Sequence, residues 1–529
     1  MNRRELLRWL AASASVTAPR WAGASLKLGS NPFTLGIASG SPHHDSVVLW
    51  TRLHLANFLG HSQLPDSPIA VRWQLANDER FIHLVQEGVA NAMPQLGHSV
   101  HVEPHQLRSD SWYFYRFIVG DFVSPVGRTR TFAAPNAITS RLRFAYASCQ
   151  RFESGYYSAY AHMARESLDA VVFLGDYIYE YNSRGAAVAR TLPSYLPAFA
   201  DTVEGYRMRY AAYKSDANLQ AMHAQCPWIV TWDDHEVYND YAATQGEDLA
   251  ANFMQRKAAA YQAFYEHKPL RASTLIAGLD SLKTNGELRI YGAFNAGQLA
   301  HFLVLDDRQY RSNQACPKPG RGGGSVVRAQ ECAELFDPSR SLLGAAQERW
   351  LDQSLASTGA QWNILAQQTL VGRRNYSPSN NANQALLQTD NWDGYPAARS
   401  RMLGSIQTHR PSNPVFVGGD IHQNWVGHIK ADFSKAASPT IATEFCGTSI
   451  SSAGGLNDEK FKERLANNPH FVFADAEQRG YGVVELTRES MTTTLRVVDN
   501  VRQAHTQVST LAVFHVASGS NSIVRDAKH

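Results

Sequence analysis

The sequence predicts an α/β fold in which a large α/β domain follows a small antiparallel β-sandwich. The first observation is length, because 529 residues are too many for one ordinary core and indicate at least two domains. The second is that residues 33–132 form short alternating patterns separated by turn signals. The third is that, from about residue 141, apolar runs alternate with longer helical patterns, which is typical of an α/β domain.

Composition and charge narrow the class of protein. Hydrophobic residues make up 44% of the chain and charged residues 18%, a balance that excludes a disordered chain and a membrane protein. The formal net charge is only +3, and no long run of Lys or Arg appears, so we expect no nucleic-acid-binding patch. A small anionic substrate would require only a local positive site.

Residues 1–24 have the pattern of a twin-arginine signal peptide. Arg3 and Arg4 precede a modestly apolar stretch, and a small-residue sequence ending at Ala24 follows it. The alternative is an ordinary amphipathic first helix, because Arg20 interrupts the apolar run. We expect the twin-arginine export machinery to deliver the protein to the periplasm or the medium. No later segment is apolar for long enough to span a bilayer, so the mature protein should have no membrane span.

The region 30–135 is expected to form the N-terminal β-sandwich, of the immunoglobulin or fibronectin type III kind. In residues 113–117 the side chains alternate cleanly between the two faces of a strand. The predicted strands lie in the segments FTLGIASGSP, SVVLWTRL, IAVRWQLA, SVHVEP, SWYFYRFIVG and GRTRTF. All six are therefore assigned to the small domain.

The region 141–520 is expected to form the large domain. Helical patterns over residues 155–167 and 252–267 separate some of its strands, and a hairpin of residues 481–486 and 492–498 is expected to complete a second sheet. The predicted strands are 142–147, 170–174, 228–232, 301–305, 362–366 and 415–417.

The chain has five cysteines, and an odd number in an exported protein leaves at least one outside a disulfide. Cys149 is the candidate for that role. Cys316 and Cys332 enclose a glycine-rich loop that could close easily, so they are the candidate disulfide in an oxidising compartment. Two surface thiols are the alternative for this pair.

Polar side chains follow the predicted strands at the points where the strands end. In open α/β sheets ligands bind outside the carboxyl ends of the strands, so these segments should converge on one site. In chain order, the residues are Cys149, Asp176, Tyr179, Asp233, Asp234, His235, Glu236, Asp306, Arg308, Asp420 and His422.

Such a concentration of carboxylates would repel itself unless cations neutralised it. Carboxylate and phenolate oxygens suit hard cations, whereas imidazole and thiolate suit transition metals, so the residue types predict a mixed site with more than one ion. Two neighbouring ions can bind an anionic substrate, acidify a bound water and stabilise the leaving oxygen. The pattern therefore predicts phosphoester hydrolysis, by attack of a metal-bound hydroxide on phosphorus.

Several motifs together resemble the PhoD-type alkaline phosphatases. They are FTLGIASGSP with VVLWTRL, the ASC turn, GDYIYEY, WDDHEVYND, LDDRQYR, WDGYPAAR, GGDIH and EFCGTSIS. The resemblance covers nearly the whole mature chain in the family's order. It implies a calcineurin-like metallophosphatase domain, which is a four-layer α/β/β/α sandwich, preceded by a β-sandwich. It also implies twin-arginine export and a cofactor of ferric iron with calcium.

The resemblance assigns metal ligands residue by residue. Cys149 and Tyr179 match the family's thiolate and phenolate iron ligands, and Asp176 matches the carboxylate that bridges iron and calcium. Asp234 lies where other metallophosphatases have an asparagine ligand. The remaining metal or neighbouring positions are Asp233, Asn239, Asp420 and His422.

The resemblance also assigns groups that act on the substrate. His235 lies where relatives have the histidine that contacts the phosphate or protonates the leaving group. Arg308 is expected to act in catalysis as a positive charge near the phosphate, and Arg311 and Arg399 are expected to bind the substrate.

Three alternatives remain open at this point. The same metal core would serve a phosphodiesterase or a phospholipase D-like hydrolase. An exported binding protein would use the β-sandwich and lack catalysis, but that predicts gaps in the ligand set, and the sequence shows none. An oxidoreductase gains little support, because no cofactor fingerprint is visible. The sequence leaves the choice between monoesters and diesters open, since a fold does not define its substrate.

Overall fold

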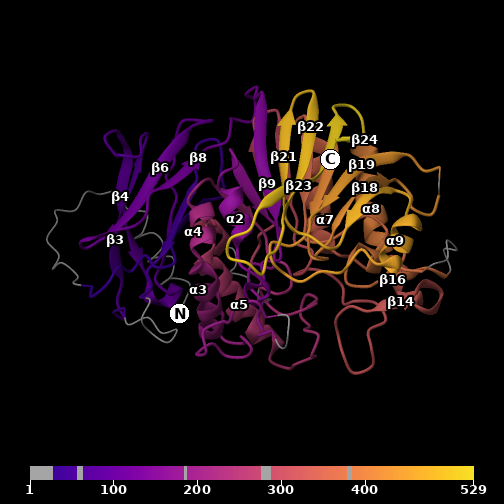
Figure 1. Cartoon of the computed structure of the whole chain (residues 1–529), viewed down its shortest axis with the longest axis horizontal. Helices are drawn as coiled ribbons and strands as arrows, with labels where there is room; N and C mark the ends of the chain where they lie inside the picture. Colours follow the sequence, from indigo (N-terminus) through magenta and orange to yellow (C-terminus); the bar gives the residue numbers. More distant parts are fainter. Residues whose placement is uncertain are drawn as a thin grey trace.

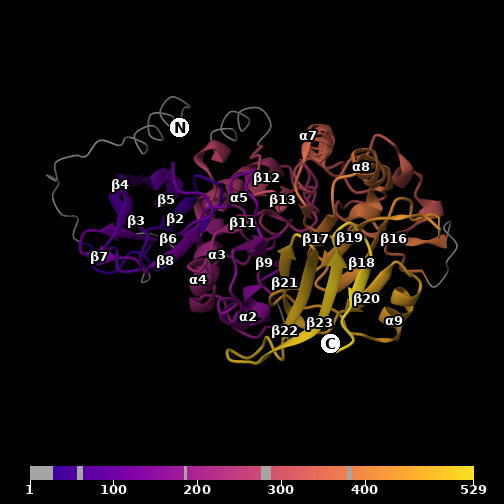
Figure 2. The same cartoon turned by 90° about the horizontal axis from the view of Figure 1, so that it is seen from above.

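Two large β-sheets face one another, and helices cover their outer faces (Figure 1, Figure 2). Strands of the N-terminal region lie at one end of the long axis of the molecule, and the C-terminal strands lie in the other half (Figure 1). The predicted signal peptide falls outside the described residues. No helix within the described part of the chain is long and apolar enough to cross a bilayer. The computed structural model describes residues 28–55, 64–183, 188–275, 287–377, 384–435 and 437–528.

The first large sheet has ten strands. They are β1 (Ile37–Gly40), β2 (Val48–Arg52), β5 (Ser99–Val102), β9 (Arg141–Ala147), β10 (Ala170–Phe173), β11 (Trp228–Val230), β21 (Arg479–Thr487), β22 (Ser490–Val498), β23 (Val508–Ala517) and β24 (Ile523–Arg525). Their order is β24-β23-β22-β21-β9-β10-β11-β1-β2-β5. The strands β9, β10 and β11 run parallel, so their carboxyl ends meet at one edge of the sheet.

The second large sheet has seven strands. They are β12 (Gly292–Ala296), β13 (Ala300–Val304), β15 (Trp362–Ala366), β17 (Pro414–Gly418), β18 (Asn424–Lys430), β19 (Thr440–Cys446) and β20 (Phe471–Asp475). Their order is β12-β13-β15-β17-β19-β18-β20, and β13, β15, β17 and β19 are parallel. The six strands predicted after residue 141 are all present in the two sheets, with ends shifted by no more than two residues.

A shared apolar core joins the two sheets. Phe144 and Val172 of the ten-stranded sheet belong to one buried cluster with Phe302, Ile364 and Val417 of the seven-stranded sheet. Helices α2 (Ser158–Met163), α3 (Val203–Lys214), α4 (Ala217–His223) and α5 (Phe253–His267) cover the outer face of the first sheet. Helices α7 (Gly344–Ser357) and α8 (Pro396–His409) cover the second. This is the predicted four-layer α/β/β/α sandwich.

Smaller elements lie at the edges of this sandwich. Strands β14 (Val326–Arg328) and β16 (Leu386–Gln388) form a separate two-stranded sheet. Helix α9 (Glu459–Ala466) precedes β20, and its Phe461 packs on Trp425.

The N-terminal β-sandwich shares one of its sheets with the large domain. Its other sheet consists of β3 (Ile69–Ala76), β4 (Leu84–Ala92), β6 (Trp112–Val119), β7 (Phe122–Val123) and β8 (Gly127–Arg130). The sandwich core includes Leu49 of β2 and Tyr115 of β6. However, β1 also pairs with β11 through Gly40 and Trp228, so β1, β2 and β5 extend the ten-stranded sheet. Alternation of side chains predicts a strand but does not identify its partner.

The C-terminal hairpin lies in the first sheet, which corrects the prediction that it completes the second. Strand β21 pairs antiparallel with β9, and β22 follows it. Gly482 makes this pairing possible, because a Cβ at that position would lie only 2.0 Å from the ring of Tyr146 on β9. The absent side chain leaves room for the tyrosine ring between neighbouring strands.

Candidate active site

The candidate active site lies where strands of both large sheets end. Loops after β9, β10 and β11 supply residues from the first sheet, and the loop after β17 supplies Asp420 and His422 from the second. Three groups of side chains have ligand atoms within 4.8 Å of one another: Cys149, Asp176 and His422; Asp176, Asp234 and His235; and Asp233, Asp234 and Asp420. Because Asp176 and Asp234 each belong to two groups, the groups form one continuous site.

The backbone at this site adopts left-handed conformations that residues other than glycine rarely adopt. Four of the seven residues in the groups have left-handed φ angles: Cys149 (59°), Asp176 (58°), Asp420 (65°) and His422 (54°). Such conformations cost free energy in residues other than glycine and persist only where the surrounding structure holds them. The chain turns sharply directly after a buried strand, which directs these side chains toward one centre.

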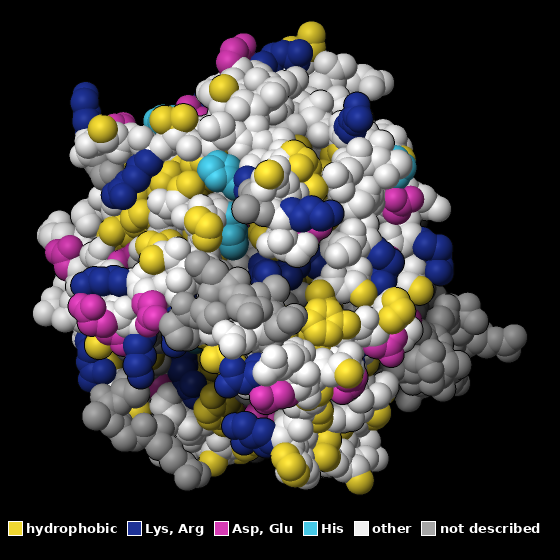
Figure 3. All heavy atoms as spheres, turned by 90° about the vertical axis from the view of Figure 1, so that its right-hand side faces the viewer, with side chains coloured by type: hydrophobic (Ala, Val, Ile, Leu, Met, Phe, Trp, Pro, Cys, Tyr) yellow, Lys and Arg dark blue, Asp and Glu magenta, His cyan; other side chains and the backbone are white. Residues whose placement is uncertain are grey.

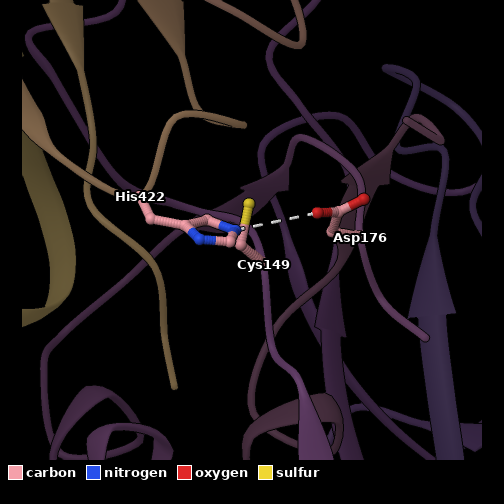
Figure 4. Close-up of side chains that lie close together, drawn as sticks. All are labelled: Cys149, Asp176 and His422. Atoms are coloured by element: carbon pink, nitrogen blue, oxygen red, sulfur yellow. Dashed lines mark ion pairs between the residues drawn. The ribbon is translucent and has the colours of Figure 1, made fainter. Parts of the chain in front are cut away.

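Cys149, Asp176 and His422 point toward one another (Figure 4). The fourth member of this group is Tyr179, whose hydroxyl donates to Asp176 Oδ2 at 2.7 Å and lies 3.1 Å from His422 Nε2. Ser452 donates to the same hydroxyl oxygen at 2.7 Å. Burial, together with the charge of Asp176, raises the pKa of Tyr179 well above its ordinary value. Tyr179 is therefore a neutral phenol unless a strong Lewis acid binds it.

His235 in the second group is fixed by a carboxylate. Its Nδ1 lies 2.7 Å from Glu180 Oε2, and its ring packs against that of Tyr179 at a tilt of 34°, with 4.1 Å between centroids. Burial alone would lower the pKa of His235, but the carboxylates of Glu180, Asp234 and Asp176 raise it well above its ordinary value. These carboxylates favour the protonated form of the imidazole, and Nε2 is the ring nitrogen that Glu180 does not bind.

The third group surrounds a buried arginine. Arg308 forms ion pairs with Asp233, with Asp390 at 2.6 Å and with Asp420 at 3.3 Å, and it lies 3.9 Å from Asp234. Its side chain is only 1% exposed. The guanidinium thus offsets part of the negative charge of these carboxylates, rather than facing solvent where a substrate would arrive.

Two buried carboxylate oxygens indicate that cations fit the site. Asp176 Oδ1 and Asp233 Oδ2 have no hydrogen-bond partner among the described residues. Burial raises the pKa of both carboxyls well above the usual range, since a charged form there is poorly solvated. A cation would supply the missing partner. The thiol, phenol and imidazole of the first group suit a transition metal, and the carboxylates suit a hard cation.

The remaining predicted residues make other contacts. The side-chain amide of Asn239 donates to Glu247 at 3.3 Å. Arg311 is paired with Asp390, and Arg399 is paired with Asp393 at 2.7 Å. Cys316 and Cys332 form a disulfide, while Cys149, Cys226 and Cys446 are free thiols.

Three residues that organise the site had no role in the sequence analysis: Glu236, which lies in the third converging segment, and Glu180 and Asp390, which the analysis did not name. Glu236 accepts hydrogen bonds from the backbone N–H groups of Asp176 (3.0 Å), Tyr177 (2.7 Å) and Asp233 (2.9 Å). Glu180 and Glu236 lie next to predicted ligands in GDYIYE and DDHE, so their position in these runs was a usable signal. Asp390 had none, because it lies far along the chain from its partner Arg308.

Comparisons with known proteins agree with this architecture. The family described as "PhoD-like phosphatase, N-terminal domain" matches residues 18–133, and "PhoD-like phosphatase" matches residues 144–495. Alkaline phosphatase D of Bacillus subtilis (strain 168) is 43% identical over 492 residues, which are 92% of this chain and 81% of that protein. The solved "Structure of PhoD" superposes with a TM-score of 0.87 at 41% identity, covering 95% of this chain and 93% of that one.

The four-layer sandwich and its similarity to phosphatases define the class of this protein, which is a phosphoesterase. The chain belongs to the PhoD-like phosphatase family. The predicted resemblance, fold class and enzyme class are thereby confirmed.

Proposed function

We propose that this chain hydrolyses phosphate esters, monoesters, diesters or both, at a site that holds ferric iron and calcium. The observation that carries the proposal is the position of Asp176. It belongs to both the thiol-containing group and the His235 group, and its Oδ1 is buried without a partner among the described side chains. A carboxylate in this position could bridge two cations, and two cations are what an anionic ester requires.

The donor types suggest which residues would hold each ion. Cys149, Tyr179, Asp176 and His422 would hold iron, because ferric iron is a Lewis acid strong enough to ionise a phenol. Asp176 and Asp234 would hold calcium through carboxylate oxygens. When bound, the two cations would neutralise the substrate phosphate and supply a nucleophilic water at neutral to alkaline pH.

The protein's own residues would protonate the leaving group. The raised pKa of His235 favours its protonated form, and Glu180 binds its Nδ1, so Nε2 would be the atom available to the substrate. An imidazolium there would donate to the departing alkoxide of the ester. Glu180 would hold the ring in the productive orientation. None of these residues distinguishes a monoester from a diester.

We also propose export through the twin-arginine route, directed by residues 1–24. The Cys316–Cys332 disulfide supports this, because disulfides persist mainly in oxidising compartments. Replacing Arg3 and Arg4 with lysine should retain the chain in the cytoplasm, as measured by immunoblots of cell fractions. Normal export of that variant would contradict the twin-arginine assignment.

The metal-dependent function is tested by metal analysis combined with kinetics. Elemental analysis by inductively coupled plasma mass spectrometry should find iron and calcium in protein purified without chelators. It should hydrolyse a monoester or a diester from a small panel, and chelation followed by calcium addition should abolish and then restore the rate. Full activity in a chelated, iron-free sample would refute the proposal. The ratio of the monoester and diester rates separates a phosphatase from a phosphodiesterase.

A further inference from the structure

A phosphate ester needs a positive side chain that it can reach, and the three arginines predicted for this role are already engaged. Arg308 and Arg311 have side chains that are only 1% exposed and paired with carboxylates. Arg399 is 7% exposed and bound to Asp393. Basic and acidic side chains are interspersed on the face shown in Figure 3. Among its described residues, that face therefore offers no single basic patch for an anionic substrate.

Arg151 differs from those three in its bonding. It lies two residues after Cys149, and its side chain is 15% exposed. Its contact with Glu153 is long, at 3.9 Å, and both of its hydrogen bonds to Tyr181 are 3.4 Å. Its Nε is buried and has no hydrogen-bond partner among the described residues. Because both Nη groups have only long hydrogen bonds within the described part of the chain, this guanidinium would gain from binding an anion.

The position of Arg151 relates it to the ligands and to His235. Its guanidinium carbon lies 4.7 Å from the ring centroid of Tyr179 and 4.4 Å from that of Tyr181. The His235 ring contacts the same two rings, at 4.1 Å and 5.6 Å between centroids. The backbone N–H of Arg151 donates to Ser452, which also bonds Tyr179. Arg151 and His235 therefore border the same part of the site.

We propose that Arg151 is the guanidinium that binds the phosphate group of the substrate. This inference rests on the proposed function. The planar fork of an arginine donates two parallel hydrogen bonds to phosphate oxygens, which a lysine cannot do. The Tyr179 and Tyr181 rings hold the fork beside the metal ligands, and the substrate supplies the acceptors that Glu153 and Tyr181 supply only weakly.

The test compares Arg151→Gln and Arg151→Lys with wild-type, metal-loaded protein. We expect Arg151→Gln to raise KM and the inhibition constant of inorganic phosphate by about tenfold or more, with unchanged iron content and melting temperature. Arg151→Lys should recover part of the loss, because it keeps the charge without the fork. Calorimetric titration with inorganic phosphate should show the same order of affinities. Arg165→Gln removes an exposed arginine shortly after α2 and is the matched control for net charge.

Two outcomes would overturn the proposal. One is that phosphate binds Arg151→Gln within about twofold of wild type while iron is retained. If Arg151→Gln loses iron, the Arg151→Lys variant is the one to compare. The second outcome is that Arg151→Lys retains iron and binds phosphate as tightly as wild type, which would contradict a role for the guanidinium fork. The failure of the proposed function looks different. In that case wild-type protein lacks ester hydrolysis or is indifferent to chelation, whatever the phosphate titrations show.

Discussion

Two buried clusters of ionisable side chains meet at Tyr177. One is the acidic site, represented by Asp176 and Asp233. The other, here called the basic core, consists of Lys214, Lys268, His223, His267 and Arg52 and lies among α3, α4, α5 and the strand β2. The backbone of Tyr177 is bonded to Glu236 beside the acidic site, whereas its ring contacts Lys268 and its hydroxyl contacts His223.

The basic core is sealed by aromatic rings. Lys214 Nζ lies 4.0 Å from the ring centroid of Trp50, and the rings of His223 and Trp228 are stacked at 3.9 Å. Burial lowers the pKa of Lys214 to about 7 and that of Lys268 well below its ordinary value. The lowered pKa values favour loss of protons from these bases, which would relieve their mutual repulsion.

The acidic site remains open at one edge. The side chains of Asp420 and His422 are 21% and 24% exposed, and their loops carry the left-handed backbone angles. Cations from solvent can therefore reach its carboxylates. The basic core is sealed, so no ligand can reach its side chains in the same way. A buried cluster of like charges is thus insufficient to identify a site. Among the described residues, unpartnered buried atoms occur in both clusters, including Lys268 Nζ in the basic core, so the open edge is the discriminating feature.

Replacing the shared carboxylate should have the largest effect. Asp176→Asn keeps the shape of the side chain but removes the charge common to two ligand groups, so activity should fall about a thousandfold or more, or about 4 kcal/mol in barrier. Cys149→Ala should likewise abolish activity, with loss of iron. Steady-state kinetics and elemental analysis check both variants.

The fold of these variants should survive. Asp176 is a buried carboxyl with a raised pKa, so a neutral amide should leave the unfolding free energy of metal-free protein unchanged or higher. Asp352→Asn, on the exposed surface of α7, is the control for handling and net charge. Near-normal turnover of Asp176→Asn would remove the main distinction between the acidic site and the basic core.

A smaller effect is expected for Glu236, which lies between the two regions. Its carboxylate receives three backbone N–H groups from the loops that carry Asp176 and Asp233. In Glu236→Gln an amide NH₂ would face one of those donors, so we expect metal affinity and turnover to fall by about ten- to a hundredfold. Titrations with calcium and iron, together with kcat, measure this.

Glu444 offers a matched control for Glu236. It is also fully buried and accepts from two backbone N–H groups, those of Val371 and Gly372. Glu444→Gln should therefore lower the unfolding free energy and leave metal affinity near that of wild type. If both variants lose metal affinity equally, the effect of Glu236 is on the stability of the fold in general. The proposal that Glu236 positions the loops of Asp176 and Asp233 would then be wrong.

The sequence predicted which loops carry the candidate ligands and that these loops converge on one site. Apolar runs ending at Ala147, Phe173 and Val230 are followed at once by polar clusters, and parallel strands bring such clusters to one edge. The contacts of individual side chains were not predictable in this way. Arg308 reaches Asp390, 82 residues away, and this depends on the relative position of two loops.

Strand partners were also beyond the sequence. The pattern GYGVVEL predicts a strand but gives no sign that it pairs with β9, since that choice depends on Gly482 accommodating Tyr146. Similarly, β1 and β2 alternate as expected for a sandwich, but a single pairing of Gly40 with Trp228 attaches them to the large sheet. Register and partner choice are properties of the assembled sheets.

Lys214 should show the smallest effect on activity and a distinctive effect on stability. Its pKa is about 7 in the folded protein and 10.5 in the unfolded chain. Between these values the unfolded chain binds more protons, so wild-type stability should rise with pH by at most about 1.4 kcal/mol per unit. Below pH 7 both states are protonated, and the full cost of burying the charge remains.

Lys214→Met removes this titration, so the variant should be more stable than wild type near pH 7, and the advantage should shrink toward pH 10. Urea unfolding at several pH values measures the difference, which cancels groups that titrate alike in both proteins. Lys268 and His223 do not cancel, because the charge of Lys214 lowers the pKa of each, so their response is part of the measured difference. Lys462→Met, at a side chain that is 66% exposed, should show no such trend. A pH-independent difference would mean that Lys214 keeps its charge. The basic core would then carry charge, as the acidic site does. Burial and closure by aromatic rings would then not be enough to explain the difference between the two clusters.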